Sequence, residues 1–405
     1  MLHSKNALIF VLITICIDSI GLGIIIPSFP VLVSETANVS VNESSKYFGL
    51  VMGTYAFMQF FFSPLIGNLS DRFGRRPILL ISVLGMGLDY AFMCFAPTLV
   101  WLIIGRAIAG IFGASFTTAT AYIADISTNE NRAKNFGMVG AAFGIGFVIG
   151  PAIGGLLTDF GSRAPFFVAA CFSILNFVYG YFVLKESLPE SDRRKFELKR
   201  ANPFGAFKQI VKFEKNKYLF VVIFVVMIAN MALHSLWNYY TMDKFAWTAK
   251  DVGISLAVVG VAFAIVQGGL SGILVRKFGE KGAATMGLLF LISTTFLMGL
   301  IPSGWMMYVL IFPYAFCGII EPSIRSLVSG KVQDNEQGEL QGIFTSIMSL
   351  AEILSPLFFM WIYYSATRIK PTPSVNFGVP FFVCSGIAFL AFLLLRWILK
   401  RKILK

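Results

Sequence analysis

Long apolar stretches recur along the whole chain, and they limit how it can fold more than any other feature. Of its 405 residues 57% are apolar and only 13% are charged, far more apolar surface than a water-soluble core needs. A helix of roughly 20 apolar residues crosses a hydrocarbon core of about 30 Å. The sequence therefore predicts an all-α membrane protein. The twelve predicted spans are 7–33, 47–69, 77–96, 99–124, 136–158, 164–184, 218–240, 252–275, 282–301, 305–330, 340–364 and 378–397.

The basic residues predict the orientation of these spans, because Lys and Arg collect in cytoplasmic loops. With a cytoplasmic N-terminus, 25 of the 33 Lys and Arg fall in cytoplasmic segments and two lie within spans. We expect a bacterial inner-membrane protein with both termini inside. The net charge of +12 comes from loops that recur between spans, not from one basic patch, so we expect no nucleic-acid partner. The six outward basic residues are Lys46, Arg163, Lys244, Lys250, Arg368 and Lys370.

The spans divide into two predicted six-helix bundles, 1–184 and 218–405, joined by a cytoplasmic linker, 185–217. Within the linker, 203–211 has the amphipathic spacing of a helix that lies on the bilayer surface. An internal repeat supports the two bundles, since one shift of 205 residues relates several landmarks. These pairs are Gly67 with Gly272, Phe73 with Phe278, Gly74 with Gly279, Arg76 with Lys281 and Pro151 with Pro356.

One compact cluster of charge separates the second and third spans, at 67–77. Its length and basic residues predict a short cytoplasmic turn. The pattern Gly-x-x-x-Asp-Arg-x-Gly-Arg-Arg resembles the signature loop between helices 2 and 3 of the major facilitator superfamily. In the second half Arg276 stands opposite Asp71, so we expect the first loop to carry the gating role. The predicted cytoplasmic gate residues are Gly67, Asp71, Arg72, Gly74, Arg75 and Arg76.

Ionisable side chains inside spans are functional candidates, because each costs at least about 2.5 kcal/mol to insert. Desolvation disfavours the charged form of a carboxylate, which suits a group that loads and releases a proton. Glu321 and Arg325 lie one helical turn apart, as a fixed ion pair or as a proton-switched gate. The predicted proton-coupling residues are Asp18, Arg106, Glu321, Arg325 and Glu352.

Arg106 has two readings: a permanent charge beside the transport cavity, or a counter-ion for Asp18 or Asp89. We expect Asp89 to be a hydrogen-bonding group between helices. His234 adjoins an aromatic end of its span that an interfacial belt also explains. Span position and polarity give the predicted substrate contacts, which are Met58, Gln59, Asn230, His234, Trp237, Tyr240 and Gln267.

The fifth span is dense in glycine and contains a proline, which predicts a close-packing face and a kink. The run 140–155 resembles the antiporter motif of the same superfamily, and that resemblance favours export. The motif residues on this helix are Gly146, Gly150, Pro151 and Gly154.

Further motifs, among them Asp89-Tyr90, 123–125 and 337–342, resemble the tetracycline-resistance branch of the drug:proton antiporters. That branch implies a coupling and substrate role for Asp18 and Arg106. It also carries a histidine in helix 8 and an essential acid in helix 9, where this chain has Phe263 and Leu291. Glu321 and Glu352 are therefore expected to supply proton coupling from the second half.

The sequence favours a proton-coupled antiporter that exports an amphiphilic small organic molecule by alternating access between the two bundles. Proton-coupled uptake of a nutrient or a siderophore-like metal chelate uses the same fold and stays open. A membrane sensor that does not transport is a further alternative. We expect no enzyme activity, because no nucleophile and base pair or phosphate loop is present, no cofactor beyond the proton gradient, and a monomer. The five cysteines all lie in apolar runs without metal-ligand spacing, which predicts packing roles and no metal site.

Overall fold

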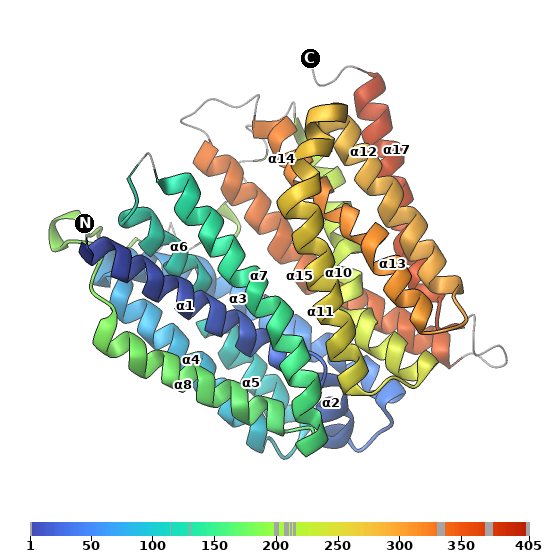
Figure 1. Cartoon of the computed structure of the whole chain (residues 1–405), viewed down its shortest axis with the longest axis horizontal. Coiled ribbons are helices and arrows are strands. Elements are labelled where there is room, and N and C mark those ends of the chain that lie inside the picture. Colours follow the sequence, from blue (N-terminus) through green and yellow to red (C-terminus); the bar gives the residue numbers. More distant parts are fainter. Residues whose placement is uncertain are drawn as a thin grey trace. The chain divides into compact units, whose positions relative to one another are not determined.

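The computed structural model describes residues 2–113, 115–128, 131–197, 202–205, 210, 213, 216–329, 337–368 and 376–401 (Figure 1). Within these ranges the regular structure is helical throughout. Eleven helical runs are long and apolar enough to cross a membrane, and the longest, Ala249–Leu300, has 52 residues. This run breaks at Gly279, whose φ of 67° suits glycine, so two predicted spans lie on either side of the break. The predicted all-α, twelve-helix membrane fold is confirmed.

The chain forms two compact units that we describe separately. Unit 1 comprises Met1–Val39, Thr54–Pro203 and Ala249–Ala257, and unit 2 comprises Ser40–Gly53, Phe204–Thr248 and Val258–Lys405. The first part of α3 (Val41–Phe73) thus belongs to unit 2, and the first part of α11 (Ala249–Ile265) belongs to unit 1. The predicted bundle and linker boundaries remain predictions. Much of the amphipathic segment at 203–211 lies outside the described residues.

Unit 1 is built around the contact of α1 with α7, which run side by side in Figure 1. Buried apolar side chains of α1, α4, α6 and α7 form a common core, with Phe10, Leu79, Tyr122 and Val139 among them. Its elements are α1 (Leu2–Ile25), α2 (Phe29–Ala37), most of α3 (Val41–Phe73), α4 (Arg75–Phe95), α5 (Leu99–Phe112), α6 (Ser115–Asp125), α7 (Arg132–Leu157), η1 (Thr158–Phe160), α8 (Ala164–Val183) and η2 (Glu190–Asp192).

Unit 2 packs α10 against α15 and α17, and α12 against α14 and α17. Within the described parts of its spans, two short segments depart from α-helical geometry: a π-helix that interrupts the eighth span and a 3₁₀ turn in the tenth. Its elements are α10 (Lys217–Phe245), the second part of α11 (Ala249–Ile265), the π-helix η5 (Val266–Leu270), α12 (Ser271–Leu300), α13 (Trp305–Ala315), the 3₁₀ turn η6 (Phe316–Ile319), α14 (Ile320–Ser329), α15 (Gln337–Thr367) and α17 (Val379–Lys400).

The repeat detected at an offset of 205 residues has a counterpart in the backbone. Gly74 and Gly279, which the offset relates, both have positive φ, 101° and 67°. Pro151 and Pro356 both lie inside long helices, and a glycine from another helix packs on the carbonyl of each. Gly253 contacts Pro151 in unit 1, and a Cβ on Gly49 would lie 2.9 Å from the Pro356 oxygen in unit 2. Both halves therefore contain the same kind of close helix crossing, in which a glycine packs on the carbonyl of a helical proline.

Candidate functional site

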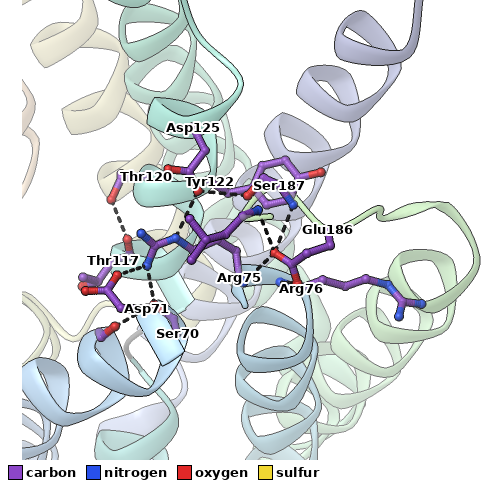
Figure 2. Close-up of polar contacts among 12 residues, drawn as sticks. Ser70, Asp71, Arg75, Arg76, Thr117, Thr120, Tyr122, Asp125, Glu186 and Ser187 are labelled. Carbon is purple, nitrogen blue, oxygen red and sulfur yellow. Dashed lines mark hydrogen bonds and ion pairs between the residues drawn. The ribbon is translucent and has the colours of Figure 1, made fainter. Parts of the chain in front are cut away.

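Arg75 holds together the polar cluster at the cytoplasmic loop of unit 1, where its side chain lies between two carboxylates (Figure 2). Its Nη1 donates to Asp71 Oδ1 at 2.6 Å and to Ser70 Oγ at 2.7 Å. Its Nε donates to Asp125 Oδ2 at 3.1 Å. Asp71 and Ser70 belong to α3, and Asp125 ends α6. One guanidinium therefore ties the start of α4 to the ends of α3 and α6 with charge-assisted hydrogen bonds.

Glu186 caps the first turn of α4 (Figure 2). Its Oε1 accepts the Arg75 amide at 2.8 Å and its Oε2 accepts the Arg76 amide at 3.2 Å. A helix begins with amides that have no partner inside the helix, and it favours negative charge there. Gly74 is required beside this cap, because its φ is 101° and a Cβ on it would overlap the Glu186 carboxylate.

Arg76 fixes the end of α8 to the same cluster. Its Nε donates to the Leu184 carbonyl at 2.7 Å and its Nη2 to the Tyr181 carbonyl at 2.8 Å. A cation is favourable at these terminal carbonyls because of the helix dipole. Of the other two predicted gate residues, Gly67 joins this network through its carbonyl, which accepts the Ser70 hydroxyl at 2.8 Å, and Arg72 makes no hydrogen bond to it among the described residues. Arg72 is exposed and stacks on Phe73 with its Cζ 5.0 Å from the ring centre, and nothing lies within 4 Å of a Cβ built on Gly67.

Four side chains of the cluster were absent from the predicted gate: Ser70, Asp125, Glu186 and Ser187. Asp125 and Ser187 are linked by a hydrogen bond of 3.0 Å, and Glu186 forms the cap. For Asp125 the sequence did hold a signal, an acid at the cytoplasmic end of an apolar run. Glu186 carries no periodicity or motif signal, since its partners lie 110 and 111 residues away.

A buried ion pair joins α4 and α5 inside unit 1. The Arg106 guanidinium contacts the Asp89 carboxylate, and the side chains are 3% and 0% exposed. The rings of Phe29 and Tyr55 lie 5.7 Å from the guanidinium carbon, close enough for cation–π attraction. Of the two counter-ions considered from the sequence, Asp89 is the one that Arg106 contacts.

Two further acids of the spans, Asp18 and Glu352, have different surroundings. Asp18 is half-buried in α1, where Asn176 Nδ2 lies 3.4 Å from its Oδ1. Asn176 also contacts Thr14, so it bridges α1 and α8. Glu352 is half-buried in α15, and no hydrogen bond or ion pair joins it to another residue in the part of the chain that the structure describes.

Glu321 and Arg325 form an ion pair with 2.7 Å between Oε1 and Nε. Arg325 also reaches the neighbouring helix α15. Its Nη1 donates to Gln341 Oε1 at 2.9 Å, and its Cζ lies 4.7 Å from the centre of the Phe344 ring. Glu321 is thereby coupled to the packing of α14 on α15. Both readings of the pair, a fixed lock and a proton-switched gate, fit this geometry.

Five of the predicted substrate contacts lie in unit 2, where their surroundings differ. Trp237 and Tyr240 are 2% and 0% exposed in unit 2, so neither presents surface to a ligand in this conformation. Asn230 accepts a hydrogen bond from the Tyr314 hydroxyl at 2.9 Å. His234 is exposed on α10 and Gln267 is exposed on η5.

The other two predicted contacts lie in unit 1, where they pack against the end of α5. Gln59 donates to the Gly113 carbonyl at 3.2 Å. A Cβ on Gly110 would lie 2.6 Å from Met58 Cβ.

The predicted antiporter-motif helix α7 packs on α1 at backbone distance. A Cβ on Gly146 would lie 2.5 Å from the Cys16 oxygen, and one on Gly150 would lie 2.7 Å from the Ile20 oxygen. A Cβ on Gly154 would overlap the backbone of Ile24. These three glycines therefore set the spacing of the two helices, as small residues do in membrane packing.

Phe263 and Leu291, the positions where the resemblance implied a histidine and an acid, both pack against other side chains of unit 2. Leu291 is 0% exposed, and the Phe263 ring lies 5.7 Å from the Tyr314 ring, centre to centre. Among the described residues no group of three His, Cys, Asp or Glu is placed to hold a metal ion.

Comparison with known proteins places this geometry in a family. The family model of the Major Facilitator Superfamily matches residues 11–356 and 219–403. The chain is 38% identical to the tetracycline resistance protein, class C, of Escherichia coli, over 89% of this chain and 91% of that protein. It is 30% identical to multidrug resistance protein 1 of Bacillus subtilis, over 88% and 90% of the two chains. A crystal structure of the nucleoside transporter NupG shares the fold, with a TM-score of 0.78 at 12% identity over 99% of this chain and 100% of that one. The chain belongs to the major facilitator superfamily, where its curated relatives include tetracycline resistance proteins.

Proposed function

We propose that this protein is a proton-coupled antiporter that exports an amphiphilic small organic molecule across a bacterial inner membrane. The two predicted bundles alternate access to a binding site, with both termini in the cytoplasm and the monomer as the working unit. Relatives named for tetracycline and multidrug resistance support export of an organic drug-like compound. Family membership supports a transporter over an enzyme. The apolar residues Phe263 and Leu291 argue for a substrate other than tetracycline, or for other coupling residues.

Glu352 carries the proton-coupling part of the proposal. It is a half-buried carboxyl in the middle of a span-length helix, and the described residues offer it no ion pair. A carboxyl in that position is functional by default, because the bilayer penalises its charged form. It can gain or lose a proton without breaking a salt bridge, which is what a coupling group requires when the two orientations differ in proton affinity.

Asp18 and the Arg106–Asp89 pair supply the corresponding chemistry in unit 1. Asp18 has the amide of Asn176 beside it, and a neutral amide can serve either protonation state of a carboxyl. The buried guanidinium keeps a permanent charge in the same unit. When Glu321 in unit 2 binds a proton, it loses its negative charge and its attraction to Arg325 weakens. We assign Asp18, Glu321 and Glu352 as proton carriers.

The loop cluster of unit 1 is proposed as the cytoplasmic gate. Arg75, Arg76 and Glu186 join the ends of α3, α4, α6 and α8, so unit 1 can move as one body at this end. The close packing of α7 on α1 supports the antiporter reading through its resemblance to the family motif. Gln59, Asn230, His234 and Gln267 remain the proposed polar contacts of the substrate.

The test is transport by purified variants in proteoliposomes with an imposed pH gradient and a fluorescent amphiphile. Glu352→Gln and Glu321→Gln should each abolish pH-driven flux while substrate binding stays measurable. Glu190→Gln is the matched control, because this glutamate is 89% exposed outside the spans. Unchanged flux in both coupling variants would remove the assignment. Flux along the proton gradient would favour uptake, and binding without flux in the wild-type protein would favour a sensor.

A further inference from the structure

Unit 2 contains a cavity of about 410 Å³ where α12 begins, bordered by η5, η6 and α14. Its walls include both departures from α-helical geometry in this unit. π-helical turns are rare and occur often at functional sites. Gly318, in the 3₁₀ turn, leaves room for Gln267 of the π-helix, since a Cβ there would lie 2.6 Å from Gln267 Nε2. The volume lies within the range of small-molecule sites.

Five of the residues that line the cavity have polar side chains: Gln267, Ser271, Glu280, Ser323 and Ser326. Ser323 is 2% exposed, and its Oγ has no hydrogen-bond partner in the described part of the protein. Buried hydroxyls are normally satisfied, so this one is set up for a partner that is not part of the chain. The Glu280 carboxylate lines the cavity and accepts a hydrogen bond from Ser326. Much of the remaining wall is apolar, including Val275 and Pro322.

Comparison of the two repeats shows that this cavity, in the part of the chain that the structure describes, lacks the basic group that Arg75 supplies in unit 1. The offset of 205 residues places Glu280 on Arg75, and Arg276 on Asp71. In unit 1 the Arg75 guanidinium fills the space between α3 and α6. In unit 2 the equivalent position holds a carboxylate at the wall of a cavity, and no basic side chain pairs with Glu280 among the described residues. Arg276 is turned to the Gly272 carbonyl at 3.2 Å and does not line the cavity.

We propose that this cavity binds an organic cation whose amidinium, guanidinium or ammonium group sits on Glu280 and whose apolar body lies along Val275 and Pro322. The ligand's cation takes the place that Arg75 occupies in the other half. Ser323 Oγ accepts a further N–H from the ligand, and Gln267 borders the site on η5. The site lies within unit 2 and shares only Gln267 with the proposed substrate contacts. Its occupation requires no transport, so it goes beyond the proposed antiport.

The probe is 4-(trifluoromethyl)benzamidine, compared with 4-(trifluoromethyl)benzamide, which has the same shape without the charge. Binding to the purified full-length protein is measured by fluorine NMR titration. The cation should bind saturably and at least about tenfold more tightly than the amide, because a charge-assisted hydrogen bond distinguishes them. Glu280→Gln should weaken benzamidine binding by at least about tenfold and leave the amide unchanged.

Two further variants make the outcome specific. Ser323→Ala removes an unpartnered hydroxyl without adding volume, so it should fold, and it should weaken benzamidine binding by about three- to tenfold. Glu190→Gln should leave binding unchanged. Equal binding of benzamidine and benzamide, wild-type affinity in Glu280→Gln, or no saturable benzamidine binding would each overturn the proposal. Loss of affinity in Glu352→Gln but not in Glu280→Gln would place the cation at the transport site and overturn it as well.

Discussion

Replacing Arg106 by methionine should destabilise the protein strongly, because it leaves Asp89 alone in the interior of unit 1. The two side chains are 3% and 0% exposed, so solvent screens neither charge. Breaking a buried pair by removing one partner costs about 3–5 kcal/mol. An orphaned aspartate can escape part of this cost by binding a proton, which at pH 7 requires about 4 kcal/mol for an ordinary aspartate. We expect Arg106→Met to lose about 3–5 kcal/mol of unfolding free energy.

The double variant Arg106→Met with Asp89→Asn separates structure from transport. It removes both charges and keeps the shape of the acid, which sits tightly against Gly105. Its unfolding free energy should return to within about 2 kcal/mol of the wild type, because no charge is left buried. Unfolding is measured by titration with sodium dodecyl sulfate in mixed micelles. Strict additivity of the two single losses would refute the pairing. If Arg106 serves coupling as well, the folded double variant will still fail to transport.

Two other substitutions, each with a matched control, test the helix packing and the helix cap. Gly154→Ala places a methyl on the backbone of Ile24 and should cost about 1–3 kcal/mol of unfolding free energy, whereas Gly140→Ala, with nothing within 4 Å among the described residues, should change it by less than about 1 kcal/mol. Glu186→Ala should destabilise the first turn of α4 by about 1 kcal/mol, seen as faster amide hydrogen exchange there, while Glu190→Ala should leave that turn unchanged. Similar exchange in both glutamate variants would contradict the capping role.

The spans and their helical class followed from the sequence because the thickness of the hydrocarbon core fixes how long an apolar helix must be. The turn at Gly74 was equally readable, since charge cannot remain between two apolar runs without reaching water. The repeat paired Gly74 with Gly279 from the sequence, and the structure has a positive φ at both. These features depend on local composition and on the thickness of the hydrocarbon core.

Other features depend on partners far apart in the sequence, and composition cannot specify them. Glu186 caps a helix that begins 111 residues earlier. Asp89 and Asp18 were both possible partners of Arg106, and only the packing of α4 on α5 selects Asp89. Tyr240 was predicted to contact substrate because it is polar and lies near the end of a span. In the structure its ring packs on the ring of Phe381, with 4.5 Å between the ring centres.

The most direct test of the antiport claim is the internal pH of proteoliposomes that contain the purified protein and a trapped pH-sensitive dye. A panel of lipophilic cations, tetracyclines, amino acids and metal chelates is added outside. A substrate that enters through an antiporter drives protons out, so at least one amphiphilic compound should make the interior alkaline, and Glu352→Gln should abolish that response. Acidification on addition would establish symport and contradict export, and a folded protein that leaves the internal pH unchanged for the whole panel would contradict the proposed proton coupling.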